Sequence, residues 1–134
     1  MTAGALHILI VATAGVLGGI ARFWVSGLVA RRIGERFPWG TLVVNTTGAA
    51  GIGMLAALLP AFGAGGDGVL ALWLALAVGV LGSYTTVSSF SLQTLALIRD
   101  SELLRAFLNI VGSLGLCLAA TTAGYFSVLW IFGS

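Results

Sequence analysis

The feature that most constrains this chain is a run of thirty residues, Val69–Ile98, that contains no Asp, Glu, Lys or Arg. Its flanks are apolar, but its centre, Gly82–Ser91, is crowded with Ser and Thr hydroxyl groups. A straight helix of this length would reach ~45 Å, against ~30 Å of bilayer hydrocarbon. The excess length and the glycine-led polar centre predict a helix that breaks near the middle of the membrane. Broken backbone is tolerated at that depth only where protein or a water-filled cavity satisfies it, as at the ion sites of transporters.

Three further stretches are long and apolar enough to cross a bilayer. Together the four predict an all-α membrane protein with a single domain, 1–134, and approximate spans at 6–30, 40–62, 69–98 and 106–132. Only 7% of the residues are charged, and this leaves no stretch for a soluble domain or a nucleic-acid-binding surface. We interpret the first stretch as a span and not as a secretory signal peptide, since no basic segment precedes it and it is too long.

The arginines are placed asymmetrically along these spans. With four spans, the loops 31–38 and 99–105 face the same side of the membrane, and the segment 63–68 faces the other side together with both termini. The two loops on the first side hold Arg31, Arg32, Arg36, Arg99 and Arg105, whereas the other side has no Lys or Arg. The positive-inside rule therefore predicts that loops 31–38 and 99–105 are cytoplasmic.

Four helices form a small bundle with a filled centre, so we expect any pore to require an oligomer. Helix association in lipid depends on close packing of small residues. The candidate contact positions are Gly15, Gly19, Gly48, Gly51, Gly53, Gly112 and Gly115.

The polar groups inside the spans favour an anion over a cation. No Asp or Glu lies within any span, which argues against a proton relay and against an acidic ring that selects cations. Asn45 is open to two interpretations, an interhelical hydrogen bond or a donor that faces an aqueous path. Arg22 either reaches the interface or lends positive potential to a vestibule. The edge of the Phe90 ring carries partial positive charge. No nucleophile–base pair or metal-ligand cluster is present, so we predict no enzymatic activity.

Four segments carry a resemblance to a known family: Gly18–Arg22, Phe37–Asn45, Gly82–Ser91 and Gly112–Leu114. Taken together, the patterns Pro-x-Gly-Thr-Leu-x-x-Asn and Thr-Thr-x-Ser-x-Phe-Ser are specific. Over nearly the whole chain the sequence resembles the Fluc (CrcB) family of fluoride channels. The resemblance implies an antiparallel dimer with two pores in the bacterial inner membrane, through which toxic cytoplasmic fluoride leaves passively.

The resemblance also implies roles for individual residues. The fluoride pore would be lined by Asn45, Val87, Ser88, Phe90, Asn109 and Ser113. Arg22 would lie in a vestibule. The backbone carbonyls of Gly82 and Thr85 would hold a structural sodium ion at the dimer axis.

The chain departs from the family pattern at three positions. The family usually has Phe at the position of Val87 and commonly has Glu at that of Gln93, and the position of Arg105 is often uncharged. Val87 removes one pore ring, and the arginine bias favours a single orientation. We therefore hypothesise that the chain pairs with a paralogous chain of opposite orientation, and a homodimer is the alternative.

Two other functions compete with a fluoride channel. A small multidrug exporter also forms an antiparallel dimer of four-helix chains, but its chemistry needs a membrane carboxylate. A non-conducting partner subunit would explain the helices and the small residues, but not the hydroxyl groups gathered at the predicted break.

Overall fold

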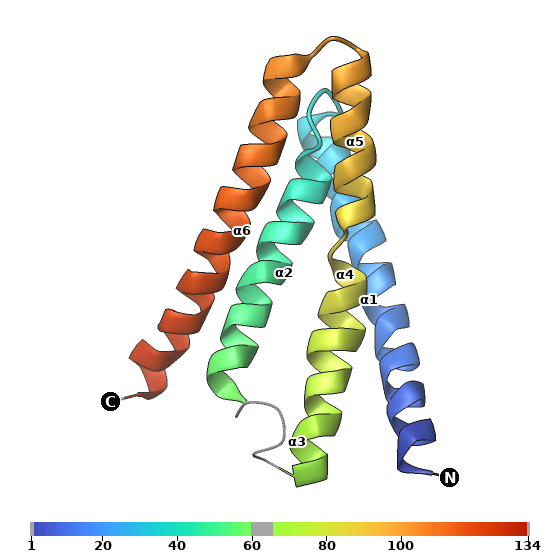
Figure 1. Ribbon diagram of the computed structural model, residues 1–134, viewed down its shortest axis with the longest axis vertical. Helices are drawn as coiled ribbons and strands as arrows, with labels where there is room; N and C mark the ends of the chain where they lie inside the picture. The colour runs from blue at the N-terminus through green and yellow to red at the C-terminus, as the bar shows by residue number, and fades with distance from the viewer. Residues whose placement is uncertain (1, 60–65, 134) are drawn as a thin grey trace.

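The computed structural model describes residues 2–59 and 66–133, and these residues are almost entirely helical (Figure 1). The predicted end of the second span at residue 62, with Pro60, lies outside the described residues. The elements in chain order are α1 (Ala3–Ile33), α2 (Trp39–Leu58), α3 (Gly66–Trp73), the π-helix η1 (Leu74–Leu81), α4 (Gly82–Tyr84), α5 (Val87–Arg99) and α6 (Leu103–Phe132).

Four of the described segments are long and apolar enough to cross a membrane, which confirms the predicted fold class. They are α1, α2, the composite segment Gly66–Arg99 and α6, with 31, 20, 34 and 30 residues. The third segment is interrupted at Thr85 and Thr86, as its polar centre predicts. The dimer remains a prediction.

The helix ends follow local signals in the sequence. The N-cap Thr2 accepts a hydrogen bond from the Ala5 amide at 3.4 Å, and Pro38 directly precedes α2. Gly34 ends α1 with φ 99°, a conformation that costs glycine little. The two arginine-rich connections lie together at one end of the bundle, opposite both chain termini (Figure 1).

Glycines permit close helix packing at several contacts between the spans. Cβ atoms added at Gly53 and Gly124 would overlap the backbone oxygens of Thr121 and Ala50, so α2 and α6 approach backbone to backbone. Likewise, α1 approaches η1 where a Cβ at Gly18 would meet the carbonyl oxygen of Val80. These glycines therefore set the helix separations in this bundle, as is usual in lipid.

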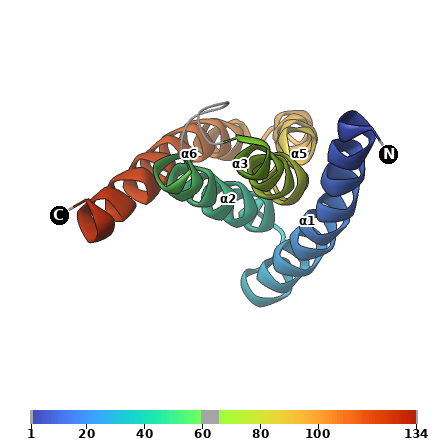
Figure 2. The ribbon, with the colours of Figure 1, turned by 90° about the horizontal axis from the view of Figure 1, so that it is seen from below.

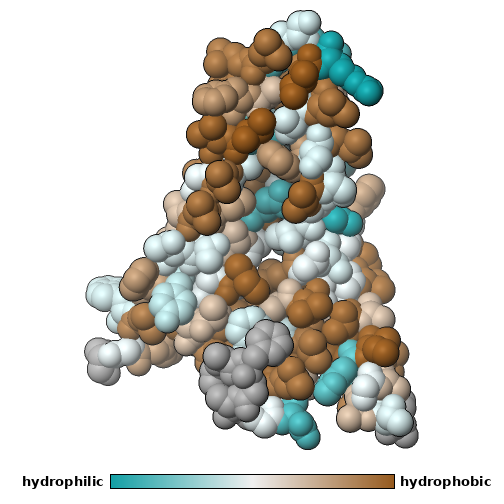
Figure 3. Space-filling model, viewed as in Figure 1, coloured by the Kyte–Doolittle hydropathy of each residue, from teal (hydrophilic) through white to brown (hydrophobic). Residues whose placement is uncertain are grey.

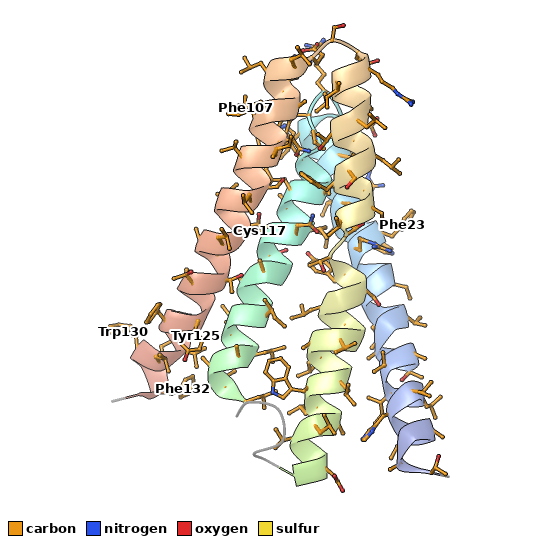
Figure 4. The ribbon with its side chains drawn as sticks, viewed as in Figure 1. Phe23, Phe107, Cys117, Tyr125, Trp130 and Phe132 are labelled. Carbon is orange, nitrogen blue, oxygen red and sulfur yellow. The ribbon has the colours of Figure 1, made fainter. Side chains whose placement is uncertain are left out.

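The four spans form a row that widens toward the termini. Seen from below, α6 and α1 are the outer helices, and α2 and the third span lie between them (Figure 2). Apolar residues cover most of the face seen in Figure 3, and a small hydrophilic group lies near mid-height. Phe23, Phe107 and Trp130 point away from the bundle (Figure 4) and are 77%, 60% and 85% exposed. Such exposure is ordinary for side chains that face hydrocarbon.

Candidate functional site

The third span breaks at two consecutive threonines with extended backbone. Thr85 has φ −78° and ψ 159°, and Thr86 has φ −152° and ψ 121°. The Thr86 hydroxyl oxygen accepts a hydrogen bond from the Ser89 amide at 3.2 Å and thereby caps the N-terminus of α5. The same hydroxyl lies 3.1 Å from that of Ser88 and 3.2 Å from that of Ser89. The break therefore gathers three hydroxyl groups at the start of α5.

The N–H and C=O groups of Thr86 are paired by a side chain from another helix. Asn45 on α2 donates through Nδ2 to the Thr86 carbonyl at 2.9 Å, and its Oδ1 accepts from the Thr86 amide at 2.7 Å. Unpaired backbone groups at this depth would be costly, so this pairing stabilises the break. Of the two interpretations of Asn45, the interhelical hydrogen bond is the one observed. Its contact with an ion stays a prediction.

Arg22 on α1 also reaches the break. Its Nη1 donates to the Thr85 carbonyl at 3.4 Å, a long hydrogen bond. Arg22 lines a hollow of about 210 Å³ whose wall also includes Ser26, Thr41, Thr86 and Ser89. A larger hollow of about 480 Å³, nearer the arginine-rich connections, shares Ser26, Thr41 and Ser89 with it. These hollows place the Arg22 charge beside polar surface, although its vestibule role stays a prediction.

On α6, two polar residues predicted for the pore are buried within the subunit. Asn109 is 1% exposed and donates through Nδ2 to the Thr94 hydroxyl at 2.9 Å. Thr94 in turn donates to the Phe90 carbonyl at 2.7 Å. Ser113 is 9% exposed and lies one turn beyond Asn109 on the same face. Asn109 thus supports the helix that carries Phe90, and the pore roles of Asn109 and Ser113 stay predictions.

The first residues of α5 are open to the surroundings of the subunit. Val87 is 76% exposed, Ser88 is also exposed, and Phe90 is half-buried. The pore positions Val87, Ser88 and Phe90 therefore remain available to a neighbouring molecule.

The carbonyls that the resemblance assigns to sodium suit a hard cation. Extended backbone at Thr85 and Thr86 interrupts the helical pairing that would otherwise occupy the Gly82 carbonyl, and none of the hydrogen bonds found among the described residues ends on it. No group of His, Cys, Asp or Glu within residues 2–59 and 66–133 could hold a metal ion. Backbone oxygens are accepted ligands for such cations, and two copies of the chain would supply four of them. The Gly82 carbonyl therefore suits such an ion, whereas the Thr85 carbonyl already accepts from the Arg22 guanidinium at 3.4 Å, and the sodium site stays a prediction.

Several polar residues at the break escaped the sequence reasoning. Thr86 is the N-cap of α5 and accepts from the Ser89 amide, and a Thr directly before the first helical residues could have signalled it. The buried oxygen atoms Oγ1 of Thr46 and Oε1 of Gln93 have no hydrogen-bond partner among the described residues. The sequence singles out Gln93 only as a departure from the family pattern, and no pattern predicts that these two oxygens are unpaired, because their surroundings depend on how the helices pack.

Comparison with known proteins agrees with these features. A family model described as "CrcB-like protein, Camphor Resistance (CrcB)" matches residues 9–125. A protein named Fluoride-specific ion channel FluC 2 from Rhodopseudomonas palustris (strain BisB18) is 56% identical over 121 residues, which cover 88% of this chain and 89% of that protein. Fluoride-specific ion channel FluC 4 from Brucella abortus biovar 1 (strain 9-941) is 48% identical over 126 residues, or 92% of both chains. The chain therefore belongs to the CrcB (Fluc) family.

Proposed function

We propose that this protein is a fluoride-selective ion channel through which cytoplasmic fluoride leaves the cell passively. The observation that carries the proposal is that relatives named fluoride-specific ion channels match this chain along most of both sequences, at 48–56% identity. The family is one of ion channels, which is not an enzyme class. We place the protein in the bacterial inner membrane, with the connections 31–38 and 99–105 in the cytoplasm.

The chemistry at the break supports an anion as the permeating species. The nearby polar groups are the Asn45 carboxamide, the hydroxyls of Thr86 and Ser88, and the Arg22 guanidinium. The break lacks carboxylates, because the acidic residues are Glu35, Asp67, Asp100 and Glu102, all outside the interiors of the spans. A fluoride ion that loses its water would find N–H and O–H donors there, together with the positive edge of the Phe90 ring.

We propose that the pores form between two antiparallel subunits. The subunit widens toward its termini (Figure 1), so two copies side by side in opposite directions would fill each other's narrow ends. The open positions Val87, Ser88 and Phe90 would then meet the partner, and Asn45, Asn109 and Ser113 would complete the polar lining. A sodium ion bound by the Gly82 and Thr85 carbonyls of both copies would supply positive charge to the carbonyl dipoles exposed by the break.

For the partner, we favour a paralogous chain of opposite orientation. The described arginine-rich connections lie at one end of the bundle, which gives the chain a strong preference for one orientation. Val87 supplies no ring at its pore position, so a distinct partner would restore what this subunit lacks. The numbered names FluC 2 and FluC 4 among the relatives agree with several copies of such chains.

Fluoride efflux from liposomes tests the function. The purified chain is reconstituted alone and, where its genome encodes a second chain of this family, together with that paralogue. External fluoride is followed with an electrode after the membrane potential that holds fluoride inside is removed. Fast efflux that needs no proton gradient supports the channel. Efflux only from the mixed liposomes identifies this chain as a partner subunit. Absence of efflux from every preparation, including the mixture, contradicts the proposal.

Replacing Phe90 tests the contribution of the ring edge. Phe90→Ile keeps an apolar side chain but loses the quadrupole, so we expect fluoride efflux to fall several-fold, roughly by the worth of one aromatic contact. Phe107→Ile is the matched control on the outer surface of α6 and should stay within about twofold of the wild type. Equal efflux from the Phe90 and Phe107 variants would remove Phe90 from the pore.

A further inference from the structure

The pairing of Asn45 with Thr86 fixes which way the carboxamide points. Thr86 is extended, so its N–H and C=O face the same side of the chain. Asn45 meets both groups, at 2.7 Å through Oδ1 and at 2.9 Å through Nδ2. Exchange of the amide oxygen and nitrogen would bring two donors together and two acceptors together. The orientation of the Asn45 amide is therefore set by chemistry as well as by geometry.

This pairing uses only one of the two Asn45 N–H groups. The hydrogen that reaches the Thr86 carbonyl is the one on the same edge of the amide as Oδ1, because both atoms contact one residue. The other hydrogen lies on the opposite edge, and no second hydrogen bond from Asn45 is found among the described residues. Asn45 is half-buried and lines a hollow of about 350 Å³ that also touches Gly48, Gly82 and Cys117.

The peptide that holds Asn45 is itself held firmly. The Thr86 hydroxyl caps α5 through the Ser89 amide, so Thr86 is anchored to the helix that follows the break. The neighbouring Thr85 amide still bonds to the Leu81 carbonyl at 2.9 Å, which anchors the break to the helix before it. Asn45 is thus oriented by a peptide that has fixed supports on both sides.

We propose that the Thr86 peptide is a positioning element for Asn45, and that it leaves the second N–H of Asn45 as a pre-aimed donor for an anion. A donor already oriented before the ion arrives costs no reorganisation. Asn45 consequently has two separable tasks, closing the helix break and donating to the ion. The second task rests on the proposed function, whereas the first does not.

Two variants at position 45 separate these tasks. Asn45→Ala removes both, so the Thr86 amide proton should exchange with solvent at least about tenfold faster, the worth of one hydrogen bond, and fluoride efflux should fall. In its protonated form, Asn45→Asp keeps an oxygen that accepts from the Thr86 amide and gains an O–H that donates to the Thr86 carbonyl, but it has no second hydrogen to offer an anion. Its Thr86 amide should stay protected to within about threefold of the wild type, while efflux falls at least about tenfold.

Amide hydrogen exchange by NMR, on the full chain in nanodiscs, gives the first readout, and liposome efflux gives the second. Thr47→Val is the matched control, because the Thr47 hydroxyl bonds to the Val43 carbonyl of its own helix and to the Tyr84 hydroxyl. It should leave both readouts unchanged.

Two results would overturn the proposal. Unchanged protection of the Thr86 amide in Asn45→Ala would show that Asn45 does not hold the Thr86 peptide, a pairing called the Asn45 clamp. Efflux retained in Asn45→Asp would show that the second N–H of Asn45 is not a donor to the ion. If the wild-type protein conducts no fluoride under any condition, the proposed function is contradicted instead. In that case the exchange measurement still decides whether the clamp exists.

Discussion

The two halves of the third span are held in the membrane by different forces. Before the break, η1 packs on α1 through glycines: a Cβ at Gly18 would meet the Val80 carbonyl, and one at Gly79 would lie 2.5 Å from the Ala14 Cβ. After the break, α5 is held by hydrogen bonds from two carboxamides, Asn45 of α2 and Asn109 of α6. The first half depends on shape, and the second depends on hydrogen bonds from polar side chains of neighbouring helices.

This difference explains what the break achieves. An unbroken helix would have to present one continuous surface to its neighbours. The interruption at Thr85 and Thr86 lets the first half dock on α1 while the second half contacts α6. Most polar side chains of the span lie in the second half, where the proposed ion path lies, and in the first half the exceptions are Asp67, Ser83 and Tyr84.

The largest loss of stability is expected from Gly18→Ala, which disturbs the close packing of η1 on α1. Alanine is the better helix former by about 1 kcal/mol, so propensity alone would raise stability. Here the added Cβ would overlap the Val80 carbonyl and force α1 away from η1. Overpacking of this kind costs roughly 3 kcal/mol or more. Equilibrium unfolding in SDS-containing mixed micelles measures the loss.

Gly19→Ala is the matched control on the same helix, because a Cβ at Gly19 meets nothing within 4 Å. It should leave the free energy of unfolding unchanged or raise it slightly. Equal stability of the Gly18 and Gly19 variants would mean that α1 and η1 are not in close contact.

An intermediate effect is expected in the polar half, from Thr94→Val. The change keeps the side-chain shape but leaves the buried Asn109 amide without its acceptor. An unpaired buried group costs about 1–3 kcal/mol, whereas Asn109→Leu should cost less because the Thr94 hydroxyl still donates to the Phe90 carbonyl. The double variant should cost less than the sum, since no polar group is then left unpaired.

The same unfolding assay is applied to the wild type, the two single variants and the double variant. Additive losses in the double variant would show that Thr94 and Asn109 are not coupled. In that case the hydrogen bond between Thr94 and Asn109 would not hold α5, and the contrast between the two halves of the third span would be contradicted.

The smallest effect is expected from Thr86→Val, which removes the N-cap of α5 and keeps the peptide that pairs with Asn45. Loss of such a cap costs about 1 kcal/mol. Thr122→Val is the control, because the Thr122 hydroxyl only bonds to the Leu118 carbonyl of its own helix. If both variants are equally stable, the cap contributes nothing and the Asn45 clamp alone defines the break.

The sequence was sufficient to predict the four spans and the break, because length, hydropathy and the hydroxyl-rich centre of Val69–Ile98 are local properties. The role of each glycine could not be predicted in this way. Gly48, Gly51 and Gly53, proposed for contacts in an oligomer, contact helices of their own subunit, whereas Gly112 and Gly115 meet nothing within 4 Å there and their contact with a partner stays a prediction. Whether a glycine faces another helix depends on helix rotation, which residue spacing alone does not determine.

The partners of the site residues could not be read from the sequence. Asn45 and Thr86 are 41 positions apart, and only the packing of α2 against the break brings them together. For the same reason, the sequence placed Asn109 with Ser113 in the predicted pore lining and did not connect Asn109 to Thr94. The residue types were informative, but their pairing is a property of the tertiary fold.

The π-helical segment Leu74–Leu81 has a consequence for how this chain tolerates changes in length. Its Gly82 end bonds to the Ala77 carbonyl five residues earlier, so the segment holds one residue more than an α-helical hydrogen-bonded turn requires. A single-residue deletion there is absorbed by a return to α-helical bonding, and the two threonines keep their place opposite α2. A deletion within α5 has no extra residue to absorb it, and it displaces every side chain that follows.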